Sequence, residues 1–422
     1  MFVRLLCCAL LTLLTLFGST ASAAPALQEP LYGAEAILYC AESGQTLYEK
    51  NADVPAPPAS VTKLMTALLV LEQVDDLSKT VTVSDTAVQI ERDSTHIGLV
   101  AGEMVTLQDM LYATLMQSAN DAANVLAEAV AGSQAAFARM MNLRAAALGC
   151  TNSHFENAHG LDAPSHLVTA RDLARITAAL LEEPRFLQIS GAQTYTMPAT
   201  NKHAAPRTFY TKQRMLRKDS AFYTPDALAG KNGYTSKAQH TQVMIARKDG
   251  MTLIAVSLGA SGNRYYTWRD MRTLFAYGFG TFHTVTLHGE QVAALAAQTG
   301  AEIGTDCAPV SVTLPIGTDA QALSLSQQAN ALGLRTLQIT RNGSTQVMRT
   351  MPYPLPCDIR PAPSDENDSS RFVERLIASM LITLLGMWFT AIHTVKKSTP
   401  FQRRVPRRRR HIRRGSHRRR RF

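Results

Sequence analysis

Residues 55–74 read PAPPASVTKLMTALLVLEQV, a group of prolines followed by a long apolar stretch. Prolines suit the approach to a helix rather than its interior, so a helix is expected to begin near Ser60. Because residues 61–74 are apolar on nearly all sides, this helix is expected to be buried. Residues three apart share a helix face, which brings Lys63 to the hydroxyl group of Ser60, where the first-turn N–H groups favour negative charge. A buried lysine tends to lose its proton, as a general base for serine must, although a capping serine and a surface lysine would give the same pattern.

The segments on either side of this helix indicate an α+β fold. Residues 32–50 alternate between apolar and polar around a Ser-Gly turn, which predicts a β-hairpin. The apolar runs 241–247 and 251–258 flank a Lys-Asp-Gly turn and predict a second hairpin. Helices placed between an early and a late hairpin predict a helical cluster on an antiparallel sheet that joins both ends of the domain. Further helices are predicted at 107–116, 121–131 and 134–148.

The pattern changes after residue 282. Short alternating runs in residues 283–360 predict a small β-rich domain, and the polar, proline-containing residues 361–375 predict a linker. Cys307 and Cys357 both fall in the small domain, so the sequence is equally compatible with a disulfide between them and with two free thiols.

Both ends of the chain carry targeting features. Residues 1–23 combine an early arginine, an apolar core and an Ala-Ser-Ala site, which predicts a signal peptide. Residues 376–395 contain no Asp, Glu, Lys or Arg and predict a transmembrane helix, with a buried or interfacial helix as the alternative. The basic tail, residues 396–422, is expected to stay in the cytoplasm and to contact anionic membrane lipid. The rest of the mature chain is then expected on the outer side of the membrane.

The overall charge is misleading when it is taken alone. The chain of 422 residues has a formal net charge of +10, but 14 basic residues and no acidic residue lie in the tail from Lys396 onward. Residues 24–375 are therefore mildly acidic, and no nucleic-acid partner is expected. With 46% hydrophobic and 18% charged residues, the chain is also not a disordered polyelectrolyte.

Two further short motifs carry candidate chemistry. Ser118-Ala119-Asn120 falls at the break between two predicted helices, where a capping serine and a turn asparagine are the ordinary interpretation. Lys231-Asn232-Gly233-Tyr234-Thr235 precedes the second hairpin, where a solvated loop is the ordinary interpretation. Each motif alone is weak, but their order and spacing together with the first motif are not.

The three motifs together resemble those of penicillin-recognising serine enzymes. More narrowly, three segments are similar to the low-molecular-weight D-alanyl-D-alanine carboxypeptidases of peptidase family S11. These segments are 58–66 (PASVTKLMT), 157–174 (NAHGLDAPSHLVTARDLA) and 230–235 (GKNGYT). The resemblance covers about residues 32–280 and implies a penicillin-binding, β-lactamase-like transpeptidase fold for residues 24–282. It also implies a bacterial cell membrane protein, with a peptidoglycan stem peptide as substrate and β-lactam antibiotics as ligands.

The resemblance implies a role for each motif residue. Ser60 would attack the carbonyl group between the two terminal D-alanines, and Lys63 would accept its proton. Ser118 would relay a proton to the leaving amine, and Asn120 would orient the substrate backbone.

The third motif is implied to bind the substrate. Lys231 would attract its terminal carboxylate, and the backbone N–H groups of Ser60 and Tyr234 would form the oxyanion hole, which requires Gly233 beside them. Asn232 and Thr235 belong to the same motif and are also implied to bind the substrate. Asn232 departs from the family pattern, because a threonine is usual there, so an amide replaces the expected hydroxyl group.

Other functions use the same residues. A D,D-endopeptidase acting on cross-links needs the same groups, and a β-lactamase needs a deacylating carboxylate, for which Glu156 is the candidate. A catalytically degenerate wall-binding scaffold is the alternative that is not an enzyme. No cofactor or metal is expected, since His154, His159 and His166 fit a structural role in loops better than a metal site.

Overall fold

The computed structural model describes residues 27–298, 305, 307–329, 335–341 and 347–352. Its central feature is a five-stranded antiparallel sheet with the order β2-β1-β9-β8-β7. The strands are β1 (Glu35–Cys40), β2 (Thr46–Lys50), β7 (Ala227–Thr235), β8 (Gln239–Lys248) and β9 (Met251–Ala260). Strand β1 pairs along β9, with Glu35 opposite Leu258, so the early and late hairpins form one sheet as the sequence predicted.

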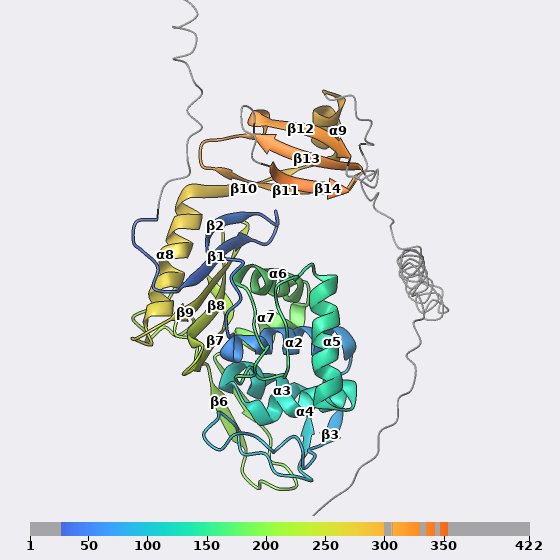
Figure 1. Ribbon diagram of the computed structural model, residues 1–422, viewed down its shortest axis with the longest axis vertical. Coiled ribbons are helices and arrows are strands. Elements are labelled where there is room, and N and C mark those ends of the chain that lie inside the picture. The colour runs from blue at the N-terminus through green and yellow to red at the C-terminus, as the bar shows by residue number, and fades with distance from the viewer. Residues whose placement is uncertain (1–26, 299–304, 306, 330–334, 342–346, 353–422) are drawn as a thin grey trace, which may run out of the picture. The chain divides into compact units, whose positions relative to one another are not determined.

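Helices cover both faces of this sheet (Figure 1). Helix α8 (Tyr266–Thr281) packs on one face, and α2 (Lys63–Gln73), α4 (Asn120–Ala131) and α6 (Ala170–Leu181) lie on the other side. Neighbouring residues of β9 belong to different cores: Ile254 faces the helical cluster and Ala255 faces α8. Because both faces are covered, β9 is buried along almost its whole length, which explains its continuous apolar run.

The predicted helices are present, with local departures at their ends. The predicted helix 61–74 begins as a 3-10 turn, η1 (Ala59–Thr62), and continues as α2. The predicted helix 107–116 is α3 (Leu107–Tyr112), followed by a π-helical turn, η2 (Ala113–Gln117). Helices α4 and α5 (Gln134–Ala147) match the remaining two predictions to within one residue at each end.

Helices α6, α7 (Pro184–Ser190) and α8 had no counterpart among the predicted elements. Helix α8 contains Gly278, Gly280 and several threonine and aromatic residues, which have weak helix propensity. Its buried face, which includes Trp268 and Met271, packs on the sheet, and this packing stabilises the helix.

The other strands form small sheets outside the central one. Strands β3 (Thr80–Thr82) and β4 (Met104–Thr106) pair, as do β5 (Thr194–Met197) and β6 (Arg207–Tyr210). Later strands are β10 (Phe282–Leu287), β11 (Val310–Pro315), β12 (Leu323–Ala329), β13 (Arg335–Arg341) and β14 (Val347–Pro352), with α9 (Gly289–Ala297) and the 3-10 turn η3 (Ala320–Ala322) among them. These later elements share their own apolar cluster, which includes Val312 and Leu337.

Several predictions fall outside the described residues. They are the signal peptide, the linker, the transmembrane helix at 376–395, the basic tail and Cys357, so the Cys307–Cys357 disulfide stays a prediction. Within the part of the chain that the structure describes, no helix has the length and apolar character needed to cross a membrane.

Candidate active site

Ser60 lies in the 3-10 turn that precedes α2. Two unusual backbone positions, one next to Ser60 and one packed against the turn, determine the shape of this turn. The residue before it, Ala59, has a positive φ of 49°. Gly160 packs directly on this turn, and a Cβ atom at residue 160 would overlap the carbonyl oxygen of Ala59. A residue with a side chain at 160 would therefore displace the turn that carries the Ser60 hydroxyl group.

Lys63 contacts Ser60 as the helical spacing predicted. Its Nζ atom lies 3.0 Å from Ser60 Oγ, and it also donates to Asn120 Oδ1 at 2.7 Å and to the carbonyl oxygen of His159 at 2.6 Å. The Lys63 side chain is fully buried. Three acceptors arranged around one buried amine fix its position beside the serine.

A second lysine–serine pair faces the first. Lys231 Nζ donates to Ser118 Oγ at 3.0 Å and to the carbonyl oxygen of Asn232 at 2.6 Å. Ser118 ends the π-helical turn η2 in the left-handed conformation, with φ 64° and ψ 28°. This conformation turns the chain sharply between η2 and α4, so that Ser118 and Asn120 both reach the same space.

Burial changes the protonation of both lysines. Desolvation, reinforced by the positive charge of Lys231, holds the pKa of Lys63 well below its ordinary value of 10.5. Desolvation and the nearby charge of Lys212 lower the pKa of Lys231 to about 7. Lys63 therefore resembles a neutral amine that can accept a proton, whereas Lys231 is still partly charged near neutral pH.

The third motif lies on β7, the edge strand of the sheet, directly against the turn that carries Ser60. A Cβ atom on Gly233 would come within 2.6 Å of the Ser60 backbone nitrogen and within 2.6 Å of Thr241 Oγ1. Glycine is therefore required for this close approach. Tyr234 is exposed beside His240, and the Thr235 hydroxyl group donates to Asp162 at 3.0 Å.

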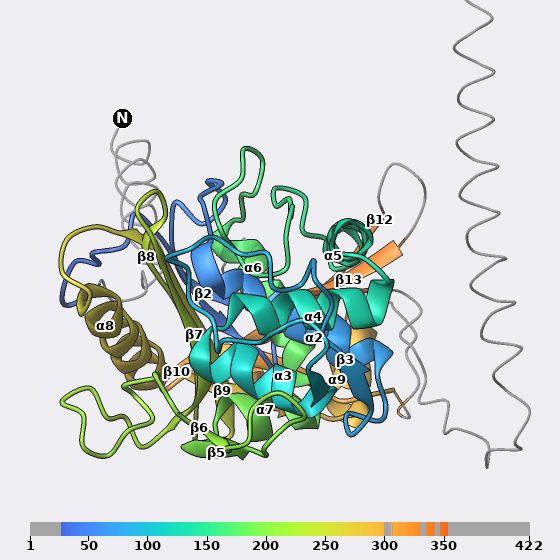
Figure 2. The same ribbon diagram turned by 90° about the horizontal axis from the view of Figure 1, so that it is seen from below.

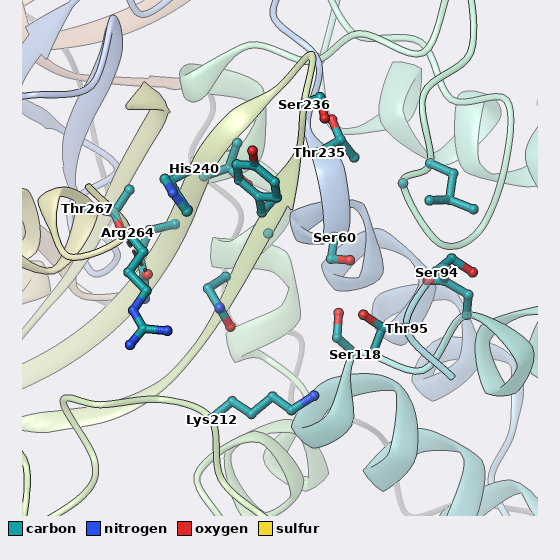
Figure 3. Close-up of a pocket in the computed structure, with 18 of the residues that line it drawn as sticks. Ser60, Ser94, Thr95, Ser118, Lys212, Thr235, Ser236, His240, Arg264 and Thr267 are labelled. Carbon is teal, nitrogen blue, oxygen red and sulfur yellow. Dashed lines mark hydrogen bonds between the residues drawn. The ribbon is translucent and has the colours of Figure 1, made fainter. Parts of the chain in front are cut away.

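The three motifs line one cleft with a volume of about 850 Å³. Figure 3 shows Ser60 and Ser118 reaching this space from the helical side and His240 and Arg264 from the sheet side. The view from below in Figure 2 shows the same division, with α8 and the helical cluster on opposite sides of the sheet. The sequence-predicted residues that line the cleft directly are Ser60, Ser118, Asn120, Asn232, Gly233, Tyr234 and Thr235, while Lys63 and Lys231 are buried beneath its wall.

Besides Arg92, three cations that line the cleft were not predicted from the sequence. Lys212 donates to the carbonyl oxygen of Gln117, next to Ser118, at 2.8 Å. Arg214 and Arg264 both lie over the ring of Tyr265, with guanidinium-to-centroid distances of 4.7 Å and 5.0 Å. They come from two segments distant along the chain, and no local sequence pattern marks them. The cations that line the cleft outnumber its carboxylates, Glu91, Asp93 and Asp162, which favours an anionic ligand.

The carboxylate and the histidines considered as further candidates make hydrogen bonds with loop residues or with Thr62. Glu156 accepts hydrogen bonds from the backbone N–H and the hydroxyl group of Ser165, at 2.5 and 2.7 Å, and it is not among the residues that line the cleft. His166 contacts Thr62 Oγ1 at 3.0 Å, and His159 Nδ1 accepts from the backbone of Leu161 at 3.2 Å.

Burial beside Lys63 lowers the pKa of His159 to about 3, so this imidazole is neutral. Among the residues that the structure describes, no three His, Cys, Asp or Glu side chains gather as metal ligands.

Comparison with known proteins yields a family match and several relatives. A family model described as D-alanyl-D-alanine carboxypeptidase, Peptidase_S11, matches residues 21–262. The D-alanyl-D-alanine carboxypeptidase DacC of Escherichia coli is 36% identical over 284 residues, which are 65% of this chain and 68% of the relative. A D-alanyl-D-alanine carboxypeptidase of Mycobacterium tuberculosis is 34% identical over 244 residues, covering 56% of this chain and 79% of that protein.

A solved structure agrees with these sequence matches. An evolved putative penicillin-binding protein homologue from Mycobacterium tuberculosis superposes with a TM-score of 0.56 at 30% identity, covering 62% of this chain and 95% of that one. The predicted α+β architecture, with helices on an antiparallel sheet, is confirmed by this likeness and by the strand order of the central sheet.

Proposed function

Because the chain belongs to the D-alanyl-D-alanine carboxypeptidase family, we propose that it removes the terminal D-alanine from peptidoglycan stem peptides through an acyl-enzyme on Ser60. The observation that carries this proposal is the 3.0 Å contact between Ser60 and the buried Lys63, whose pKa is lowered well below its ordinary value. A second lysine–serine pair lies in the same cleft. The residues proposed as nucleophile, base and proton relay thus lie in one site.

The chemistry proceeds in two steps. Ser60 Oγ attacks the carbonyl carbon between the two D-alanines while its proton passes to Lys63. The C–N bond then breaks, and the departing D-alanine amine receives a proton through Ser118. Water next attacks the Ser60 ester, the proton of that water returns through the same base, and the shortened peptide leaves.

The close packing of β7 on the nucleophile turn supports an oxyanion hole. The backbone N–H groups of Ser60 and Tyr234 would donate to the negative oxygen of the tetrahedral intermediate. The substrate peptide would lie along the edge strand, where backbone groups are free to pair with it, and Asn120 would donate to the substrate backbone. Lys231, Arg214 and Arg264 would attract the terminal carboxylate.

Two finer parts of the proposal concern ligands and location. β-Lactams would acylate Ser60 by the same route, because the strained lactam amide meets the same nucleophile and oxyanion donors. The predicted signal peptide and the predicted membrane helix support an extracytoplasmic catalytic domain anchored in the cell membrane, with the basic tail inside.

The competing functions have less support. The family model and most relatives carry the carboxypeptidase name, while one relative from Pseudomonas aeruginosa, 32% identical over 278 residues, carries the endopeptidase name. The position of Glu156, bonded to Ser165 and away from the cleft, disfavours a β-lactamase.

The direct test uses full-length protein in detergent. Incubation with a stem pentapeptide is expected to release D-alanine, and incubation with penicillin is expected to add one antibiotic mass to the peptide that contains Ser60. A matched assay with a cross-linked muropeptide separates endopeptidase from carboxypeptidase activity. Absence of both D-alanine release and the Ser60 adduct would refute the proposed function.

The lysine pKa values predict the pH dependence. Lys231, with a pKa of about 7, is charged below that pH and neutral above it. Attraction of the substrate carboxylate should therefore weaken as the pH rises, and kcat/KM should fall by about threefold or more between pH 7 and pH 9. Steady-state kinetics measure this change, with re-assay at pH 7 after exposure to pH 9 as the control for unfolding. A flat kcat/KM across this interval would contradict the assigned charge.

A further inference from the structure

Four polar side chains form a continuous chain of hydrogen bonds that ends in the cleft. Thr267 Oγ1, at the start of α8, donates to Gln242 Oε1 on β8 at 3.3 Å. Gln242 Nε2 donates to Gln213 Oε1 at 3.3 Å, and Gln213 Nε2 donates to Asn232 Oδ1 on β7 at 3.2 Å. Asn232 and Gln242 are also direct cross-strand partners. The chain therefore links α8, two strands of the sheet and the segment after β6.

In the structure this buried chain runs in one direction, from the Thr267 hydroxyl group to the Asn232 oxygen. Thr267, Gln242 and Gln213 are all at most 3% exposed. Each buried amide has its oxygen occupied by the preceding donor and uses its NH2 group for the next acceptor. Reversing one amide would place two oxygens or two NH2 groups against each other, which is costly where water cannot compensate.

The last member of the chain faces the cleft. Asn232 lines the cavity, as do Gln242 and Thr267, and the Asn232 oxygen accepts from Gln213. Among the described residues, no hydrogen bond uses its NH2 group. The NH2 group is thus the part of Asn232 that a ligand in the cleft can meet.

We propose that Gln213 is a positioning residue that turns the NH2 group of Asn232 towards the substrate, so that Asn232 binds the terminal carboxylate as a hydrogen-bond donor. An unrestrained asparagine could present either its oxygen, which repels a carboxylate, or its NH2 group. In the observed orientation the Asn232 oxygen is occupied by Gln213, which leaves the NH2 group for the ligand. Asn232 then selects peptides that end in a free carboxylate over peptides that end in a carboxamide. This inference rests on the proposed function.

The test compares two substrates that differ only at the end of the peptide. Wild-type protein and Gln213→Met are assayed on a stem pentapeptide with a terminal carboxylate and on its C-terminal carboxamide. Methionine has a similar length but no donor, so Asn232 loses its restraint. KM for the carboxylate peptide is expected to rise about tenfold, with kcat changed much less, because a hydrogen bond to a charged group is lost. For the carboxamide peptide, kcat/KM is expected to change by less than about twofold.

The same Gln213→Met change is also tested in protein that carries threonine at position 232. The threonine hydroxyl group can rotate and donate without help from Gln213. In Asn232→Thr protein, Gln213→Met is therefore expected to change KM for the carboxylate peptide by less than about twofold, so that the double-mutant cycle shows strong coupling.

Two further variants control for folding. Gln193→Met removes a different glutamine whose side chain donates to the backbone of Leu216, in the same segment as Gln213, at 2.9 Å. It is expected to leave the ratio of carboxylate to carboxamide activity unchanged. Thr267→Val removes the first donor of the chain and is expected to raise KM for the carboxylate peptide by a smaller factor, which keeps the inference testable if Gln213→Met does not fold.

The outcomes are distinct from those for the proposed function. Equal losses on both peptides in Gln213→Met, or an undiminished loss in the Asn232→Thr background, would overturn the positioning role. Wild-type protein that releases no D-alanine would instead refute the proposed function itself.

Discussion

Ser60→Ala is expected to abolish D-alanine release and penicillin labelling together, with kcat lowered by about 10⁴-fold or more. Alanine removes the attacking oxygen, and Ser118, the other serine that contacts a buried lysine, is held by Lys231 in the proposed role of proton relay. Lys63 would keep its contacts with Asn120 and with the His159 carbonyl oxygen, so the fold should survive. Release of D-alanine and mass spectrometry of the adduct measure the two losses.

Ser236→Ala is the matched control for this variant, because Ser236 lines the same cleft and is exposed (Figure 3). It is expected to retain activity within about twofold, as surface substitutions usually cause small changes. Retention of substantial turnover by Ser60→Ala would assign the nucleophile to another residue. Penicillin labelling at Ser60 in wild-type protein that releases no D-alanine would favour the scaffold alternative.

Gly233→Ala is expected to lower kcat by about 10² to 10³-fold. The new Cβ atom would come within 2.6 Å of the Ser60 backbone nitrogen, so β7 and the nucleophile turn would have to separate. The proposed oxyanion donors belong to these two segments, and stabilisation of the transition state depends on their spacing. KM should change less than kcat, since the ground-state peptide makes weaker use of these donors.

Gly280→Ala provides the matched control, because a Cβ atom at residue 280 meets nothing within 4 Å and the residue lies in α8. This change should leave kcat unaltered and stabilise the fold slightly, by about 0.5–1 kcal/mol. Thermal unfolding and steady-state kinetics measure both variants. Near-normal kcat in Gly233→Ala would show that the spacing of β7 and the turn does not control catalysis.

Local sequence patterns predicted much of the fold, because alternation and apolar stretches reflect which side of a strand or helix is buried. Alternation identified the two hairpins that share the central sheet, and the apolar stretch identified the buried α2 helix. Helix α8 was missed because its glycines and aromatic residues are weak helix formers, and packing on the sheet compensates for them.

Some features of the candidate site could likewise be predicted from local sequence, and others could not. The spacing of Ser60 and Lys63 follows from helical geometry, and their contact is therefore local information. The π-helical turn before Ser118 and the left-handed conformation of that residue depend on packing among the helices, and the sequence showed only a break there.

By itself, the sequence determined the family, the α+β architecture and the three motifs, because each rests on residues close together along the chain. Only the tertiary structure decided what lies around those motifs. It brought Lys212, Arg214 and Arg264 to the cleft and joined Thr267 to Asn232 through two buried glutamines. It also set the close approach of Gly233 to Ser60. Such contacts arise when a sheet and its helices pack, and the direction of a buried amide depends on partners that are distant in sequence.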